Sequence, residues 1–298
     1  MKVCGKEIRV QGTWIRIARL EADKYEFLDE PEAMLSGLRN CGRRIDLFTF
    51  MQRLTETSPK YTYPWEWDNL AVLPVTTFDH WWTQQIRFAP RGRVRQAGKK
   101  GVTVREVQFD DVLVRGIWEI YNECPIRQGK RFPHYGMSIE RAREYAGTFL
   151  DGSIFLGAFL GERLIGFAKL TCDENRTQAN LMHILSKVEH RDKAPTNALL
   201  AQAVRSVAER QIPFLVYQNF SYGKGRQDSL SKFKEVNGFL RIDLPRYYVP
   251  LTRLGSVAFR LGLHHRFAER FPESVAAKFR ELRTLWYNHK FQSSTEAS

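Results

Sequence analysis

The chain has 298 residues, of which 43% are hydrophobic and 27% charged. This balance is ordinary for globular proteins and excludes a largely disordered chain, while the length allows one large domain or two modest ones. Lys and Arg number 46 against 33 Asp and Glu, which gives a formal net charge of +13. The excess favours an anionic partner such as RNA, a nucleotide-linked substrate, a coenzyme phosphate or an acidic membrane surface. An ordinary basic surface explains the charge equally well.

The four cysteines lie far apart, without the spacing of a zinc site. We therefore expect buried thiols in a reducing compartment, and no bound metal. The first residues show no apolar run typical of a signal peptide, and no stretch approaches the ~18–20 apolar residues that a spanning helix needs. These features predict a cytoplasmic protein.

Residues 1–86 alternate between strand and helix patterns. Residues 7–20 and 24–28 alternate like strands, 31–42 predict a short helix, and 44–54 predict another strand. Residues 58–75 are rich in aromatic residues and proline; Trp65 and Trp67, beside Glu66 and Asp68, are expected in the core, with stacking on a ligand as the alternative. Residues 76–86 and 91–100 predict helices, the second closed by Gly101.

The order of elements after residue 101 is more informative. We predict a strand at 101–107, helices at 110–124 and 138–150 around a loop at 125–136, and a hairpin that turns at Gly161 and Glu162. A strand at 178–188, a helix from Pro195 to 211, a strand at 213–220, a helix at 228–238 and a last strand at 240–251 follow. The order β-α-α-β-β-β-α-β-α-β is typical of the GNAT acyltransferase fold.

Three short segments resemble a known family. "RGRVRQAGKKGVTVREV" (residues 91–107), "APTNALLAQAVRSVAER" (194–210) and "SLSKFKEVNGF" (229–239) are similar to blocks of the FemAB/FemX peptidoglycan aminoacyltransferases and their relatives, in the same order. The closing strand "RYYVPL" agrees with them. The resemblance implies a mixed α/β (α+β) chain with two GNAT-type domains, the first of them reduced, and a C-terminal helical tail.

The domain boundaries follow from this resemblance and from composition. We predict a reduced GNAT-like half at 1–86, a basic inter-domain helix at 87–100 and a GNAT acyltransferase domain at 101–251. A basic amphipathic helical tail follows at 252–291, and 292–298 are expected to be disordered. The tail either docks on the second domain or contacts an anionic membrane surface at the inner membrane face.

Acyl transfer to an amine requires a bound donor, stabilisation of the oxyanion and a proton acceptor. The resemblance places Lys234 against the acyl carbonyl, with Phe233 beside it; the alternative is a solvated lysine on a helix surface. For the donor, the segment 190–196 keeps Arg191 but has Ala194 and Thr196 in place of the glycines that hold a coenzyme A pyrophosphate. Donor-binding candidates at this turn and the start of the next helix are Arg191, Lys193, Thr196 and Asn197, and the resemblance adds Phe233. The donor is aminoacyl-tRNA or acyl-CoA, with no permanently bound cofactor.

The proton acceptor and the acceptor substrate are less well defined. His183 and Glu189 are the candidate bases, although a histidine within a strand is more often a core residue. Candidate acceptor-binding residues are Arg93, Arg95, Arg127, Arg131, His134, Tyr135, Tyr217, Asn219 and Tyr222; for the loop at 125–136 an ordinary basic loop is the alternative.

Three functions are consistent with these features. The first is a FemAB-like acyl- or aminoacyltransferase that acts on an amine acceptor, such as a nucleotide- or lipid-linked cell-envelope precursor, with tRNA as a partner. The second is an acyl-CoA-dependent N-acyltransferase that modifies a small molecule or a protein. The third is a non-catalytic RNA-binding module, which the net charge of +13 would suit.

Overall fold

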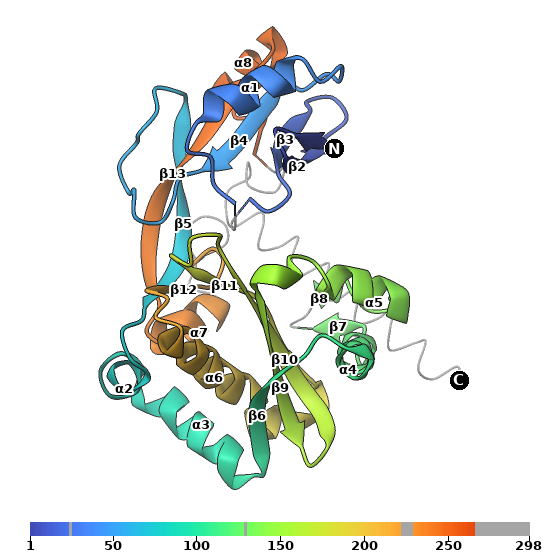
Figure 1. The fold of residues 1–298 in the computed structure, drawn as a ribbon, viewed down its shortest axis with the longest axis vertical. Helices are drawn as coiled ribbons and strands as arrows, with labels where there is room; N and C mark the ends of the chain where they lie inside the picture. Colours follow the sequence, from blue (N-terminus) through green and yellow to red (C-terminus); the bar gives the residue numbers. More distant parts are fainter. Residues whose placement is uncertain (24–25, 128–129, 222–228, 266–298) are drawn as a thin grey trace. The chain divides into compact units, whose positions relative to one another are not determined.

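The computed structural model describes residues 1–23, 26–127, 130–221 and 229–265. Within these residues the chain forms two compact units (Figure 1). Unit 1 is built from segments within 1–72 and 217–231, together with the described residues from Leu240 onward, and unit 2 from segments within 73–216 and 232–239. Two segments that the sequence suggested for the second domain therefore lie in unit 1.

Unit 1 is a mixed sheet with strand order β1-β2-β3-β4-β13-β5. Its strands are β1 (Lys2–Val3), β2 (Lys6–Gln11), β3 (Ile17–Leu20), β4 (Leu47–Met51), β5 (Trp65–Pro74) and β13 (Leu240–Pro250). β3 and β4 are parallel, whereas the other neighbours are antiparallel. β13 explains why the end of the chain belongs to unit 1: Tyr247 pairs with Phe50 of β4 on one side and with Trp65 of β5 on the other.

Two helices and an aromatic core complete unit 1. α1 (Pro31–Arg39) starts at a proline in its first turn and buries Met34, Leu35 and Leu38, which share one helix face. These side chains pack with Phe48, Phe50 and Tyr247 in one hydrophobic cluster. α8 (Arg253–Arg260) follows β13, and the Thr252 hydroxyl caps it by accepting a hydrogen bond from the Gly255 N–H. The described start of the predicted tail is therefore a helix that docks within unit 1.

The sheet strands of unit 2 lie in the order β12-β11-β10-β9-β6. Its strands are β6 (Val102–Val107), β9 (Ser153–Leu160), β10 (Arg163–Cys172), β11 (Ala179–Ser186) and β12 (Phe214–Val216). β11 and β12 are parallel and the other neighbours antiparallel. The predicted hairpin is confirmed: β9 and β10 join at Gly161, whose positive φ of 59° suits the turn.

The helices of unit 2 cover both sides of its hairpin (Figure 1). α3 (Phe88–Lys99) and α6 (Pro195–Glu209) lie on one side, and α4 (Asp111–Asn122) and α5 (Ile139–Ala146) on the other. Asp110 and Ser138 cap α4 and α5, and α4 buries a stripe with Leu113, Ile117 and Ile120. The remaining elements are α2 (Phe78–His80), a π-helix (Trp81–Gln85), 3-10 helices at Leu150–Gly152 and Val188–Lys193, and α7 (Ser229–Val236), which begins in unit 1.

The observed elements after residue 101 follow the predicted order, with differences in detail. The predicted loop at 125–136 contains two short paired strands, β7 (Ile126–Arg127) and β8 (Lys130–Arg131). The prediction of a strand at 24–28 was wrong for its described residues 26–28, which form no strand. In that segment Phe27 is buried by packing under the Arg53 guanidinium rather than by pairing in a sheet. Among the described residues, no helix is long and apolar enough to cross a membrane.

Candidate functional site

The turn between β11 and α6, which carries predicted donor-binding residues, is held by several hydrogen bonds. One carboxylate, that of Glu123 on the end of α4, accepts hydrogen bonds from the backbone N–H groups of Val188 at 2.7 Å and Glu189 at 3.0 Å. Arg127 holds the same carboxylate at 3.0 Å and donates to the carbonyl of Ser186, the last residue of β11, at 2.8 Å. The turn is therefore fixed by charge-assisted hydrogen bonds before any ligand binds.

The basic segment singled out in the sequence lies against this turn. The side chain of Gln96 donates to the carbonyl of Asp192 at 3.0 Å, and Lys100 reaches the carboxylate of Asp192 at 2.9 Å. The hydrogen bond from Lys100 is the main reason why the pKa of Asp192 lies below its ordinary value. Arg93 and Arg95 on the same helix are exposed; Arg93 bonds Gln96 and Arg95 lies over the Trp82 ring.

The predicted donor-binding residues gather at the start of α6. Arg191 is exposed, while Lys193 contacts Asp192 at 3.3 Å and the His190 ring at 3.5 Å. The Thr196 and Ser186 hydroxyls are 3.0 Å apart, which ties the first turn of α6 to the end of β11. Basic groups and a helix N-terminus at one place favour an anionic group there.

Lys234 is buried rather than solvated. Its side chain on α7 is fully inaccessible, whereas Phe233 is only partly buried. The end of the helix is held by Asn237, whose side chain donates to the Phe233 carbonyl and whose own carbonyl accepts from the Trp81 indole at 2.9 Å. This burial contradicts the alternative of a solvated lysine on a helix surface.

The two candidate bases have different surroundings. The His183 ring lies 5.2 Å from the Tyr145 ring, and burial together with the nearby Lys169 and His134 lowers its pKa to about 3. His183 is therefore neutral at physiological pH but a weak proton acceptor. Glu189 is exposed at the donor turn, where its carboxylate contacts Arg163 at 3.1 Å and His190 at 3.3 Å.

Lys169 adds a buried cation beside His183 that the sequence analysis did not consider. Burial lowers the pKa of Lys169 to about 8. Its ammonium group donates to the carbonyls of Ala146 and Thr148 and to the Thr148 hydroxyl. Because these three acceptors match its three donors, Lys169 closes the end of α5 and is not placed to exchange a proton.

The loop residues predicted to bind the acceptor divide into two groups. Arg127 is only 10% exposed and binds Glu123 and two backbone carbonyls, so its guanidinium serves the fold. His134 stacks on the Tyr121 ring at 4.7 Å, and burial lowers its pKa. Arg131 and Tyr135 are exposed and are available to a ligand.

Two further predicted acceptor residues, Tyr217 and Asn219, belong to unit 1. The side chain of Asn219 donates to Asp68 at 2.7 Å, the backbone N–H of Tyr217 donates to the Ala71 carbonyl, and Tyr222 lies outside the described residues. Asn219 and Asp68 line a cavity of about 560 Å³. The structure thus assigns Tyr217 and Asn219 to a different unit from the donor turn.

The charged wall of this cavity was not found by sequence analysis. Arg246 on β13 binds both oxygens of Asp23 at 3.1 and 2.9 Å and one oxygen of Asp68 at 2.8 Å. Burial alone would lower the pKa of Arg246, but the charges of Asp23 and Asp68 raise it above its ordinary value. The residues come from three distant segments, so no local pattern signals them.

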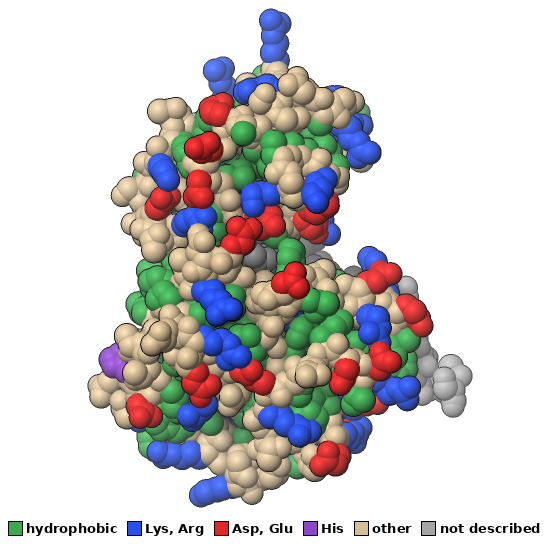
Figure 2. Space-filling view, viewed as in Figure 1, with side chains coloured by type: hydrophobic (Ala, Val, Ile, Leu, Met, Phe, Trp, Pro, Cys, Tyr) green, Lys and Arg blue, Asp and Glu red, His purple; other side chains and the backbone are tan. Residues whose placement is uncertain are grey.

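The net charge of the protein does not form one patch on the face shown in Figure 2. Lys and Arg side chains are interspersed there with Asp and Glu. The basic residues of the donor turn are likewise partly compensated, since Asp192 contacts both Lys100 and Lys193. The +13 charge is thus no evidence by itself for an extended nucleic-acid surface.

Comparisons with solved structures identify the fold. The chain is similar to a DUF2156 domain assigned to a lysylphosphatidylglycerol synthetase of Agrobacterium fabrum, with a TM-score of 0.56 and 13% identity over 85% of this chain and 83% of that one. It is also similar to L-PGS from Bacillus licheniformis, with a TM-score of 0.56 and 10% identity over 85% and 84% of the two chains. FemX gives a TM-score of 0.52 and 14% identity over 80% of this chain and 72% of that one.

No protein-family model matches the sequence, and no match was found among curated protein sequences. The likeness of the three structures therefore concerns the fold rather than the reaction. At that level it agrees with the short segments that resemble FemAB/FemX proteins and with the α/β order of elements. The chain therefore shares the fold of FemX and of the two other structures named above.

Proposed function

We propose that the protein is an acyl- or aminoacyltransferase that transfers its group from an anionic donor to an amine acceptor. The observation that carries the proposal is the fixed turn at 187–194, with the basic helix α3 bonded to it through Asp192. A turn held in place by Glu123 presents Arg191, Lys193 and the start of α6 without a cost of ordering on binding.

The residues at the start of α6 favour aminoacyl-tRNA over acyl-CoA as the donor. Pro195 is the first residue of α6 and has no N–H, and Ala194 and Thr196 stand where glycines would bring the backbone close to a pyrophosphate. The exposed Arg93 and Arg95 extend the positive charge beyond the turn, as a larger polyanion requires. One similar structure is named as a domain of a lysylphosphatidylglycerol synthetase, which supports an envelope-related acceptor.

In the proposed reaction the acceptor amine attacks the acyl carbonyl of the donor. Lys234, which the resemblance to FemX-like enzymes places against the acyl carbonyl, stabilises the negative charge that develops on the carbonyl oxygen. Glu189 accepts the proton from the amine, because it lies at the donor turn, whereas the low pKa of His183 makes that residue a poor base. The products are the acylated amine and the free donor carrier.

Donor binding tests the first part of the proposal. We expect aminoacyl-tRNA to bind saturably, and an Arg93→Ala/Arg95→Ala variant to bind it about tenfold or more weakly, with a smaller dependence on salt. Arg141→Ala/Arg143→Ala, on α5, removes the same charge elsewhere in unit 2 and serves as the control. Equal losses in both double variants would indicate only a general charge effect and overturn the assignment. Binding of acetyl-CoA alone, lost in Arg191→Ala, would assign acyl-CoA as the donor.

Single-turnover transfer tests the role of Lys234. We expect Lys234→Met to slow transfer to an amine acceptor by about 100-fold or more while donor binding is retained. Lys232→Met removes an exposed lysine of the same helix, which bonds Glu235, and should leave the rate unchanged. A thermal melt of each variant separates loss of the ammonium group from loss of folding. Full activity of a folded Lys234→Met variant would remove Lys234 from the mechanism.

A further inference from the structure

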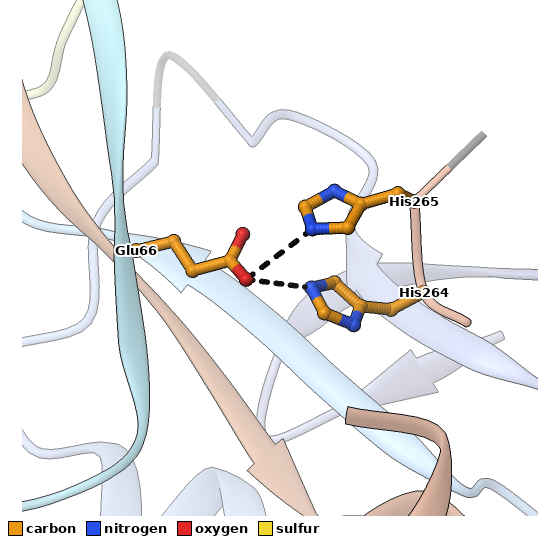
Figure 3. Close-up of side chains that lie close together, drawn as sticks. All are labelled: Glu66, His264 and His265. Atoms are coloured by element: carbon orange, nitrogen blue, oxygen red, sulfur yellow. Dashed lines mark hydrogen bonds and ion pairs between the residues drawn. The ribbon is translucent and has the colours of Figure 1, made fainter. Parts of the chain in front are cut away.

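A carboxylate and two adjacent histidines meet in unit 1, apart from the proposed donor turn. Glu66 lies on β5, and His264 and His265 follow the end of α8 (Figure 3). Nearly 200 residues separate them in sequence, so no motif relates them. Their side chains each direct one potential ligand atom to the same point, and these atoms all lie within 4.8 Å of one another.

The spacing of these atoms matches a first coordination sphere. The Nε2 atoms of His264 and His265 lie 3.1 and 3.3 Å from the same oxygen of Glu66. Ligand atoms about 2.1 Å from a tetrahedral ion are about 3.4 Å from one another. Small rotations of the imidazole rings and the carboxylate, within their side-chain wells, would centre a metal ion among the three atoms.

Hydrogen bonds from the two imidazole rings to Glu66 explain this arrangement less well than a bound metal ion does. If both rings donate from Nε2 to one carboxylate oxygen, each uncharged ring is left with an Nδ1 that can only accept. The Nδ1 of His264 is buried, and it makes no hydrogen bond of normal geometry to the described residues. A metal ion on Nε2 would place the proton on Nδ1, so that this buried nitrogen would be a donor instead of an acceptor.

The surrounding residues hold the His264 ring rigidly. It stacks on the Phe259 ring at 4.9 Å and contacts the Tyr248 ring at 4.5 Å. The His264 side chain is almost wholly buried, while those of Glu66 and His265 are 35% and 38% exposed. A buried, oriented ligand with two more accessible ones leaves an entry path for an ion.

We propose that Glu66, His264 and His265 bind a divalent transition-metal ion, with zinc the preferred one. Two imidazoles and one carboxylate are the ligand set that suits Zn²⁺, and three protein ligands leave a fourth position open. His264 and His265 also line the cavity that contains Arg246, Asp23 and Asp68. The open position thus borders a cavity of unit 1, where a water molecule or an oxygen ligand completes the coordination.

Metal titration of the full chain tests this site. We expect the metal-stripped protein to bind one Zn²⁺ saturably in calorimetry. With Co²⁺ as the probe, we expect the visible absorption bands of a tetrahedral ion with nitrogen and oxygen ligands. Glu66→Gln and His265→Ala should each weaken Zn²⁺ affinity by about tenfold or more. His80→Ala removes an exposed histidine of α2 and should leave the affinity unchanged.

The test relies on variants of the partly exposed ligands Glu66 and His265. Removal of the His264 side chain from its aromatic packing would also destabilise the fold. Circular dichroism of each variant confirms that unit 1 is intact. Unchanged Zn²⁺ affinity in both folded variants overturns the proposal, as does the absence of saturable binding to the wild-type protein. Thiolate-to-cobalt charge-transfer bands would also overturn the proposal, since they would assign the ion to cysteine ligands.

Discussion

The charged cluster of unit 1 and the donor turn of unit 2 hold their ionic groups in opposite ways. Arg246 and Asp23 are each only 11% exposed, and they come from opposite ends of the chain. Lys100 and Asp192 are 41% and 57% exposed, and both belong to segments that resemble a known family or flank one. Removal of a partner from the buried cluster should therefore cost stability, whereas removal of one from the exposed turn should mainly change binding.

The strongest test of this comparison is Arg246→Met. The substitution leaves Asp23 and Asp68 as two neighbouring, nearly buried carboxylates without their shared cation. Loss of one partner of a buried ionic group costs about 3–5 kcal/mol. We expect a fall of that size in the free energy of unfolding, measured by urea denaturation.

The matched control for this test is Arg241→Met. Arg241 lies on the same strand and pairs with Asp243, but both side chains are nearly half exposed. A surface pair of this kind contributes about 0–1 kcal/mol. Similar losses in the two variants would show that burial does not distinguish the cluster, and the comparison would fail.

A smaller loss of stability should follow from a substitution in α8, the described start of the tail, which docks in unit 1. A Cβ atom on Gly255 of α8 would lie 1.8 Å from the backbone oxygen of Asp46, so Gly255→Ala must displace the helix. We expect a loss of about 2–3 kcal/mol in thermal or urea unfolding. Gly92→Ala, on α3 of unit 2, adds a Cβ that meets no atom within 4 Å and should stabilise the protein by about 0.5–1 kcal/mol. A tolerated Gly255→Ala would mean that α8 is not held as described.

The sequence predicted unit 2 better than unit 1 for a physical reason. The caps Asp110 and Ser138, the turn at Gly161 and the proline that opens α6 act within a few residues, so local patterns reveal them. The same holds for the basic helix and the donor turn. β13, in contrast, completes a sheet with strands about 180 residues earlier, and its sequence gives no sign of that partner.

The candidate sites show the same difference between local patterns and long-range packing. The burial of Lys234 and the low pKa of His183 depend on tertiary packing, which residue type alone does not determine. Glu66 was considered only beside its aromatic neighbours, and the paired histidines only as part of a basic tail. Trp67, an aromatic neighbour of Glu66, was expected in the core but is 57% exposed. Long-range assembly brings the three metal-ligand candidates together, and it is the information that a single sequence lacks.

Acid should weaken unit 1 through Asp46, a fully buried carboxylate. Burial alone would raise the pKa of Asp46, but hydrogen bonds from the Arg16 N–H, Arg44 and Thr252 outweigh it and hold the pKa below the ordinary 3.8. Because the folded pKa is the lower one, this stabilisation is full above pH 3.8 and is lost as the pH falls through the folded value. We expect Asp46→Asn to lose about 1–2 kcal/mol at neutral pH and to flatten the acid limb of the stability curve. An acid limb as steep as that of the wild type would assign the acid sensitivity to other groups.

The smallest effect on stability, and the one that distinguishes the two regions most directly, should come from Lys100→Met. Its bond to the exposed Asp192 contributes at most about 1 kcal/mol, so the unfolding curve should hardly move. Donor binding should nevertheless weaken, because Lys100 fixes the turn that carries Arg191 and Lys193, and freeing Asp192 adds an unpaired negative charge there. Lys99→Met removes the neighbouring exposed lysine and controls for net charge alone. If both variants lose donor affinity equally, α3 contributes only its charge. If Lys100→Met loses clearly more donor affinity than Lys99→Met, the link from α3 to Asp192 positions the donor turn.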